Sequence, residues 1–335
     1  MKTTESLPSL FIERLRAIIP AGLWDSVHAT FSCPRPVSFR VNTLKADTAS
    51  VRRALEKERF ELRAVPWYPD AFFLEGGDKR ALQETTLYRD GVLYIQSVSS
   101  MFPPLLLDPR ENERVLDIAA APGSKTTQIA CLMKGTGEVV ANDKSRGRFF
   151  KLKANVAQQG VPNVTLSCRD GRLFGKDSPG SFDKVLVDAP CSSEGRFHVD
   201  EPVSWRYWKK AKIKEMVCRQ KPLLYSGIHA LRPDGRLVYA TCTFAPEENE
   251  AVVDWVLKKC DGSITVEEIA APFPNHMPGL TSWQGKKFDL RLTQALRVLP
   301  SAEMEAFFVC VIRKHDTGTG RTPVKNSNLQ ITNSK

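Results

Sequence analysis

The chain has 335 residues and lacks several of the patterns that assign function most directly. Its eight cysteines form no C-x-x-C pair and no disulfide-like spacing, and its five histidines add no metal-ligand pattern. A disulfide scaffold and a zinc site are therefore not expected. Scattered free thiols are typical of a reducing compartment, which favours a cytoplasmic protein.

Long apolar runs are missing as well. No stretch approaches the length needed to cross a bilayer, and the first residues lack the basic head and apolar run of a signal peptide. Positive charge is in excess, with a net charge of +10 at pH 7. Because no basic amphipathic helix with a bulky apolar face stands out, we expect RNA or DNA as the partner and no membrane.

The chain also lacks the two common glycine-rich nucleotide motifs. A phosphate-binding P-loop needs glycine immediately before Lys-Thr and again five residues earlier, where this chain has Ser124 and Ala119. The G-x-G-x-x-G motif of dinucleotide-binding folds is absent too. A bound nucleoside triphosphate or dinucleotide is therefore not expected at this loop.

Strands and helices alternate from Glu113 onward. Apolar runs predict strands at 114–117, 138–143, 164–167, 184–188 and 236–239, and helical spacing predicts helices at 125–133 and 145–159. This alternation predicts an α/β domain over residues 89–315, with a mostly parallel, doubly wound sheet covered by helices on both faces. The polar segment 316–335 is predicted to be a disordered tail.

Residues 1–88 show a different pattern and are expected to form a separate small α+β domain. Helices are predicted at 10–19 and 48–59, and strands at 37–42 and 71–74. Arg35, Arg40 and Lys45 are expected to be exposed in this domain. Contact with RNA fits their charge, and simple solvation of a polar face fits it equally well.

A turn of small residues, Ala119–Gly123, joins the first strand of the larger domain to its first helix. Such a turn lets the backbone approach a ligand, and the helix amino terminus that follows offers free amides. With both phosphate motifs excluded, S-adenosylmethionine is the ligand that remains. Asp143, after the next strand, is expected to bind its ribose hydroxyls, and Asp170 to accept from its adenine amine. A helix cap and a plain turn are the alternatives for these two aspartates.

Two cysteines follow strand-like runs of the same domain, Cys191 within Val185–Ser193 and Cys242 within Leu237–Thr243. Ligands of parallel sheets bind at the carboxyl ends of the strands, so both thiols are expected in one pocket. A thiolate can add to a carbon that a hydroxyl attacks poorly. Either cysteine alone would more simply be an inert packing residue.

Together these motifs resemble the NOL–NOP–Sun family of RNA cytosine-5 methyltransferases, and most of all its RsmF-type bacterial branch. The resemblance covers roughly residues 35 to 315. The chain departs from the common pattern at Ala119 and Ser124, where Cys and a second Gly are usual, and at Ser193, where Gly is usual. We also expect it to lack the extra carboxy-terminal domain of longer RsmF-type proteins. The matching segments are Asp117–Thr126, Asp143, Asp170–Arg172, Asp188–Ser193, Thr241–Thr243, Pro246–Asn249 and Tyr94–Ser97.

The resemblance implies a Rossmann-like class I methyltransferase domain, preceded by an RRM-like domain, with S-adenosylmethionine as cofactor. It implies that Cys242 adds to carbon 6 of cytosine, which activates carbon 5, and that Cys191 assists release of the product. Asp188 would hydrogen-bond the exocyclic amine or ring nitrogen 3. The implied cofactor-binding residues are Ala119, Ala120, Ala121, Pro122, Gly123, Ser124, Lys125, Asp143, Asp170 and Asp188.

Ribosomal RNA is the implied substrate of a monomeric enzyme, with transfer RNA as runner-up and a ribosomal subunit or its precursor as a further partner. Two rivals remain. A non-catalytic RNA-binding assembly factor could keep the fold, although scaffolding alone needs neither cysteine. A DNA cytosine methyltransferase would place its nucleophile at Cys191 in the Pro-Cys motif.

Two features have weaker interpretations. The segment Trp205–Lys212 mixes aromatic and basic residues, and it could contact RNA or pack on the core through its tryptophans. His198 lies near the Pro-Cys motif without an evident partner, which favours a loop histidine with no catalytic role.

Overall fold

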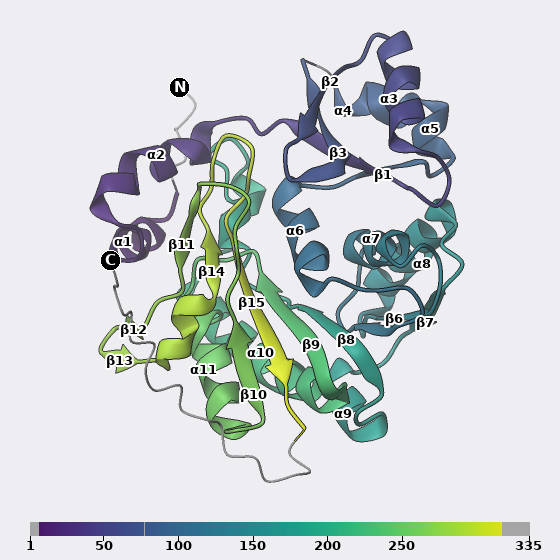
Figure 1. The fold of residues 1–335 in the computed structure, drawn as a ribbon. Helices are drawn as coiled ribbons and strands as arrows, with labels where there is room; N and C mark the ends of the chain where they lie inside the picture. The colour runs from purple at the N-terminus through teal and green to yellow at the C-terminus, as the bar shows by residue number, and fades with distance from the viewer. Residues whose placement is uncertain (1–6, 77, 317–335) are drawn as a thin grey trace, which may run out of the picture.

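The computed structural model describes residues 7–76 and 78–316, and it places them around two sheets of different size. In Figure 1 the smaller sheet and its helices lie above and to the right of the larger sheet. Apart from residue 316, the tail predicted over 316–335 lies outside the described residues.

Five parallel strands form the centre of the large sheet, in the order β7-β6-β5-β8-β9. Antiparallel strands extend it beyond β9, which confirms the predicted mostly parallel α/β sheet and adds an antiparallel part. The parallel strands are β5 (Arg114–Asp117), β6 (Glu138–Asn142), β7 (Val164–Ser167), β8 (Phe182–Asp188) and β9 (Leu231–Thr241). The antiparallel strands are β15 (Phe307–Lys314), β14 (Leu296–Val298), β11 (His276–Pro278) and β10 (Ile264–Glu267), the last paired with β15.

Helices cover both faces of this sheet because its strands are apolar on both sides. Val115 and Leu186 belong to the hydrophobic cluster under α6 (Val98–Leu107), α7 (Ser124–Leu132) and α8 (Arg146–Gln159). Their chain neighbours Leu116 and Val185 belong to the cluster under α10 (Lys210–Ala230) and α11 (Glu250–Lys259). The doubly wound, Rossmann-like arrangement is therefore as predicted.

The small sheet has four antiparallel strands in the order β2-β3-β1-β4. Along the chain its elements are β1 (Val37–Val41), α3 (Thr48–Lys57), β2 (Glu61–Val65), β3 (Tyr68–Glu75), α4 (Lys79–Glu84), α5 (Thr86–Arg89) and β4 (Leu93–Ile95). This β-α-β-β-α-β order is the RRM-like fold that was expected. Strand β4 lies after residue 88, and the domain boundary predicted there stays a prediction.

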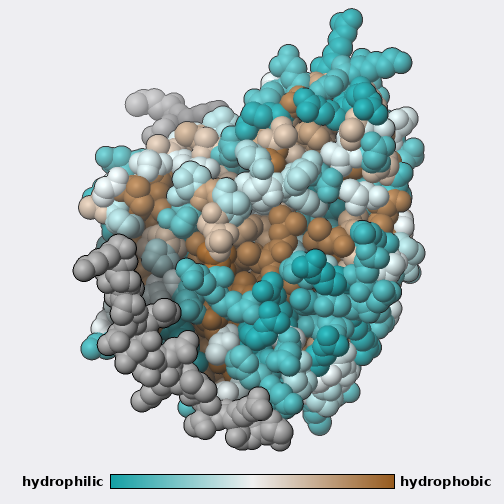
Figure 2. All heavy atoms as spheres, viewed as in Figure 1, coloured by the Kyte–Doolittle hydropathy of each residue, from teal (hydrophilic) through white to brown (hydrophobic). Residues whose placement is uncertain are grey.

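Both faces of the small sheet are covered. Phe39 and Phe72 pack on the helices of the small domain, whereas Ala71 and Phe73 join a cluster that includes α6 and the large sheet. Figure 2 shows apolar side chains gathered in a band between the two domains. An RRM stacks RNA bases on an open sheet face. This sheet has no such face free.

Arg40 is buried, which corrects the prediction that it is exposed. Its guanidinium donates to Gln96 Oε1 (3.0 Å), Ser124 O (2.9 Å) and Thr127 Oγ1 (2.6 Å). The second and third acceptors belong to the first turn of α7. Arg40 therefore ties the small sheet to the loop predicted to hold the cofactor, and it is not available to RNA.

We expect Arg40→Ala to destabilise the protein by about 3 kcal/mol, because three buried acceptors lose charge-assisted hydrogen bonds. Urea unfolding of both proteins measures the difference. Arg63→Ala is the matched control, since Arg63 is about half exposed in its ion pairs with Glu75 and Glu303. Exposed pairs contribute roughly 0–1 kcal/mol. Equal losses in the two variants would contradict a tying role for Arg40.

The first helices pack on the large domain and not on the small sheet. Phe11 of α1 (Ser9–Ile18) lies in a buried aromatic cluster with Phe197 and Phe244, and α2 (Trp24–Ala29) adds Val27. Figure 1 shows both helices on the side of the molecule away from the small sheet. The remaining short elements are α9 (Phe174–Asp177), β12 (Ser282–Trp283) and β13 (Lys286–Lys287). Among the described residues, none of the helices is both long and apolar enough to span a bilayer.

Candidate active site

Two adjoining cavities open at the carboxyl ends of the parallel strands, where the sequence places the site. The larger, of about 640 Å³, is lined by residues that follow β5, β8 and β9. The smaller, of about 280 Å³, is lined by residues that follow β5, β6 and β7. Arg148 and Pro190 line both cavities, so one elongated ligand can extend from one into the other.

A groove of about 690 Å³ continues from the larger cavity toward the small domain. Gln96, Ser193 and Arg196 line both spaces, and the far wall of the groove is formed by the segment 34–38. The larger cavity is therefore not a closed pocket for a small molecule. It has room beside it for further units of a polymer.

The loop Ala119–Lys125 bends between β5 and α7 as its small residues predict. Gly123 has a φ of +109°, which favours glycine, and a Cβ there would lie 3.0 Å from Leu152 Cδ1. Of the predicted residues, Ala119 lines the smaller cavity, and Ala121, Pro122, Ser124 and Lys125 line the larger one. Ala120 and Gly123 line neither cavity. They shape the turn through Ala120 N–H, which donates to Asn142 O (2.7 Å), and Gly123 N–H, which donates to Ala120 O (2.8 Å).

Asp117, at the end of β5, is buried beneath this loop and accepts from Thr126 Oγ1 at 2.7 Å. Burial raises the pKa of its carboxyl to about 7. Its Oδ1 atom is buried and accepts no hydrogen bond. Asp117 therefore fixes the start of α7 from below and does not line either cavity.

Asp143 lies in the smaller cavity with one carboxylate oxygen in use and one free. Its Oδ1 accepts from Ser145 N–H at 3.0 Å, whereas the buried Oδ2 accepts no hydrogen bond, although Arg148 Nη2 lies 3.4 Å away. A buried oxygen without a donor is a costly arrangement unless a ligand supplies one. Both the cap interpretation and the ligand interpretation of Asp143 therefore have support, one from each oxygen.

Asp170 also lines the smaller cavity, but its carboxylate is already engaged. Arg172 donates from its side chain to both carboxylate oxygens at 2.6–3.0 Å and from its backbone N–H to Oδ1. The hydrogen bond from Arg172 is the main cause that lowers the pKa of Asp170. A donor from a ligand would have to share these oxygens with Arg172.

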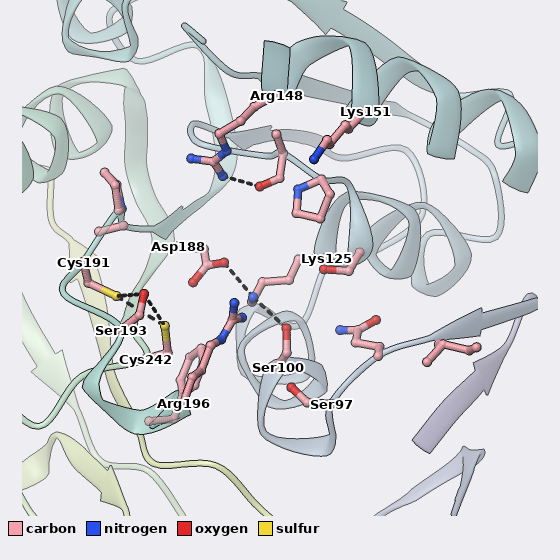
Figure 3. A pocket seen from close by; sticks show the side chains of 18 of the residues that line it. Ser97, Ser100, Lys125, Arg148, Lys151, Asp188, Cys191, Ser193, Arg196 and Cys242 are labelled. Carbon is pink, nitrogen blue, oxygen red and sulfur yellow. Dashed lines mark hydrogen bonds and ion pairs between the residues drawn. The ribbon is translucent and has the colours of Figure 1, made fainter. Parts of the chain in front are cut away.

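Asp188, at the end of β8, lines the larger cavity opposite the cofactor loop. Its Oδ2 accepts from Lys125 Nζ at 2.6 Å, and Nζ also donates to Ser100 Oγ at 2.8 Å. Figure 3 shows this chain of contacts across the cavity from α6 to β8. Lys125 is buried and holds one oxygen of Asp188, so the other oxygen can accept from a substrate.

Cys191 and Cys242 lie side by side at one end of the larger cavity, with their sulfurs 3.3 Å apart. Ser193 Oγ is 4.0 Å from the first sulfur and 3.7 Å from the second. Figure 3 shows both thiols and Ser193 facing the space near Asp188. Ser193 has a φ of +59°, which explains why glycine is usual at this position.

The two thiols differ in acidity because only one of them can donate the shared hydrogen bond. Donation by Cys191 lowers the pKa of Cys242 to about 7, with Arg196 contributing further, although burial opposes it. The same bond, together with burial, raises the pKa of Cys191. Cys242 is therefore the thiol that becomes a thiolate near neutral pH, and Cys191 keeps its proton.

A buried network of polar groups holds the two cysteine loops against each other. Glu248 Oε2 accepts from Ser192 N–H (3.0 Å) and Gln220 Nε2 (2.8 Å), and burial raises the pKa of Glu248 to about 8. Thr243 Oγ1 donates to Glu194 (2.8 Å), and Asn249 Nδ2 donates to Thr243 O (2.9 Å). Sequence reasoning noted the Pro246–Asn249 motif without assigning it a role. Its role is to join the Pro-Cys and Thr-Cys loops.

Arg196 is a further residue that sequence reasoning missed. It lines the larger cavity and lies near Glu305, with Nε 3.7 Å from Oε2. The negative charge of the Cys242 thiolate is the largest influence on its pKa, which is raised. A single arginine in a loop gives no sequence signal of this kind, because its proximity to Cys242 depends on the pairing of β8 with β9.

Trp205 and Trp208 point into the protein, which favours the packing interpretation of their segment. Trp205 is buried and its Nε1 donates to His198 O (2.9 Å), while Trp208 Nε1 donates to Glu194 Oε1 (2.9 Å). His198 lies 3.2 Å from Cys33 O through its Nε2. Within residues 7–76 and 78–316, no cluster of His, Cys, Asp or Glu could hold a metal ion.

Two family models match the chain over most of its length. The model described as 16S rRNA methyltransferase RsmB/F matches residues 104–313. The model described as the N-terminal domain of 16S rRNA methyltransferase RsmF matches residues 7–98.

Curated relatives carry the corresponding name. Ribosomal RNA small subunit methyltransferase F of Cronobacter sakazakii is 40% identical over 316 residues, and that of Vibrio parahaemolyticus is 39% identical over 315. Each alignment covers 92% of this chain but only 63% of the relative. The chain thus spans less than two thirds of the length of these relatives.

Solved structures agree with this fold. A methyltransferase homolog protein from Pyrococcus horikoshii is 32% identical with a TM-score of 0.75, and the match covers 92% of this chain and 100% of the other. NSun6 from the same organism, solved with SFG, has a TM-score of 0.77 at 23% identity, covering 92% and 98%. At that lower identity the likeness shows the fold alone.

Proposed function

We propose, from the premise that this chain belongs to the RsmB/F family of 16S rRNA methyltransferases, that it methylates carbon 5 of a cytosine in ribosomal RNA with S-adenosylmethionine as methyl donor. We propose that it does so in the cytoplasm, as a monomer. The observation that carries the proposal is the pair of thiols 3.3 Å apart in a cavity that adjoins the pocket of Asp143.

The residues around both cavities fit such a donor. The free Oδ2 of Asp143 suits a ribose hydroxyl, and Ala119 and Asp170 lie on the same pocket. Ala121, Pro122, Ser124 and Lys125 lie where the rest of the molecule would extend into the larger cavity. When bound, S-adenosylmethionine supplies a methyl group activated by its sulfonium.

The chain's own groups supply the remaining chemistry. The Cys242 thiolate forms a bond to carbon 6 of cytosine, which makes carbon 5 nucleophilic toward the methyl group. Asp188 hydrogen-bonds the exocyclic amine or ring nitrogen 3 and holds the base in place. After transfer, carbon 5 loses its proton, the bond between carbon 6 and sulfur breaks, and the electron pair returns to Cys242. Cys191, which keeps its proton, assists this release.

Incubating the chain with a methyl-labelled donor tests the proposal. The RNAs are naked 16S rRNA, small ribosomal subunits and transfer RNA, each from cells that lack the gene. We expect 5-methylcytidine in one of the ribosomal substrates. Label in transfer RNA alone would replace the substrate, label at another atom would reject the cysteine mechanism, and binding without label would favour a non-catalytic factor.

Asp143→Ala should weaken S-adenosylmethionine binding by about 1.5–3 kcal/mol, the range for hydrogen bonds to a charged group. Calorimetric titration measures this directly and does not depend on RNA. Asp177→Ala is the matched control, because Asp177 pairs with Arg169 (3.0 Å) and lines neither cavity. Unchanged affinity in a folded Asp143 variant would remove Asp143 from the binding site.

The rate of methyl transfer should rise with pH and reach half its maximum near pH 7, where Cys242 loses its proton. An ordinary thiol has a pKa of about 8.5. Arg196→Gln removes a positive charge near the thiolate, so its midpoint should move to higher pH, while Arg196→Lys should keep it near the original value. Single-turnover rates between pH 6 and 9 measure the midpoint. A common midpoint in all three proteins would rule out Arg196 as an influence on Cys242.

A further inference from the structure

The exposed face of α8 combines unpaired positive charge with an exposed aromatic ring. The segment from Lys144 to Gln159 contains five lysines and arginines and no aspartate or glutamate. Phe150 is 66% exposed. Arg146, Lys151 and Lys153 are exposed too, and none of the three forms an ion pair with a described carboxylate.

This arrangement does not favour the stability of the isolated protein. A surface helix normally places oppositely charged residues three or four positions apart, and like charges at that spacing are destabilising. An exposed phenylalanine forgoes the free energy of burial. The inner face of α8 behaves normally, with Leu152 and Val156 buried against the large sheet. The outer face is therefore better explained by a partner.

The same face adjoins the candidate active site. Arg148 and Lys151 line the larger cavity, and Figure 3 shows both side chains directed into it from the helix above. Gly147 and Ala154 are small residues between this rim and Phe150, so the surface between them is low. A chain leaving the cavity past Lys151 would reach the Phe150 ring next.

The charge favours an RNA strand as occupant. S-adenosylmethionine carries a sulfonium, an ammonium and one carboxylate, so its net charge is positive and it needs no cluster of cations outside its pocket. A phosphate backbone does need them. An exposed aromatic ring adds affinity for bases that are not stacked in a duplex, which favours a single strand.

We propose that the outer face of α8 binds an unpaired RNA segment next to the target nucleotide, with Phe150 stacking on a base and Arg146, Lys151 and Lys153 contacting phosphates. This rests on the proposed function for the identity of the target nucleotide. The binding surface itself is independent of catalysis, so the two can fail separately.

The test compares binding of a 20-nucleotide oligocytidine and an RNA duplex of equal length, by fluorescence anisotropy at several salt concentrations. Phe150→Ala should weaken single-strand binding about 5- to 150-fold, the range for one base stacked on an aromatic ring, with little effect on the duplex. Phe150→Tyr should retain the affinity. Arg146→Gln with Lys153→Gln should lower the slope of log affinity against log salt by about 2, one for each lost phosphate contact.

Two matched controls lie on the opposite side of the molecule, at β13 and the loop after it (Figure 1). Leu290→Ala removes an apolar side chain that is 74% exposed, and Lys286→Gln with Lys287→Gln removes two exposed cations. Both control variants should bind the single strand as the unaltered chain does. Equal losses in controls and α8 variants would show that only net charge matters and would overturn the proposal.

Unaltered single-strand affinity in Phe150→Ala would also overturn it, as would self-association of the protein that is lost in this variant. Methyl transfer by the unaltered chain is measured in parallel. If the chain transfers no methyl group but the α8 variants lose RNA binding, the proposed function fails and the RNA surface stands. If transfer proceeds and the α8 variants bind normally, the surface fails and the function stands.

Discussion

Cys191→Ala should methylate its RNA and then remain covalently attached to it, giving a protein–RNA band that survives denaturing electrophoresis. Cys242→Ala should give no adduct and no product, a loss of several orders of magnitude in rate, while it still binds the methyl donor. The two opposite outcomes follow from two side chains whose sulfurs are 3.3 Å apart. The shared hydrogen bond distinguishes them, since it lowers the pKa of Cys242 and raises that of Cys191.

Cys218→Ala is the control for loss of a thiol, because Cys218 is exposed on α10 and lines neither cavity. It should behave as the unaltered chain in both assays. Trapped RNA in Cys242→Ala together with an inert Cys191→Ala would assign the nucleophile to the Pro-Cys motif. That result would reverse the proposed roles and revive the DNA-type mechanism.

The parallel part of the fold follows closely from the sequence. Strands β5 and β7 have the predicted bounds, and helix α8 begins one residue after the prediction. These strands are apolar on both sides and end in an aspartate or a small turn, so local pattern alone marks them. The antiparallel strands β10, β11 and β14 were not predicted, because they are short and their pairing with distant residues defines them.

The site divides in the same way. Asp143, Asp188 and Cys242 could be placed together because each follows a parallel strand, and such strands end at one edge of the sheet. The contact of Lys125 with Asp188 depends on how α7 packs beside β8, which no local pattern encodes. Arg40 shows the limit most clearly. Its alternating strand pattern predicts a solvated face, but that face is covered by the large domain.

The position of Asp188 leads to the second large effect that we expect. Asp188→Asn should lower the single-turnover rate of methyl transfer about 100- to 1,000-fold, the cost of removing one well-placed polar group from a reacting site. A carboxylate held by Lys125 at 2.6 Å can accept from the exocyclic amine of cytosine, whereas an asparagine amide loses the ion pair and can turn its NH₂ toward the base. The base would then be held less well when Cys242 adds to it.

The control lies on the same strand. Asp183, near the other end of β8, accepts from Arg114 N–H (2.6 Å) and is far from both cavities, so Asp183→Asn should reduce stability without slowing transfer at a temperature where it is folded. Rates are compared at saturating donor and RNA, which separates loss of binding from loss of reaction. If Asp188→Asn reacted as fast as the unaltered chain, the ion pair with Lys125 would have only a structural role. If it lost covalent adduct as well as product, Asp188 would act before or during the addition of Cys242, when the base must already be held.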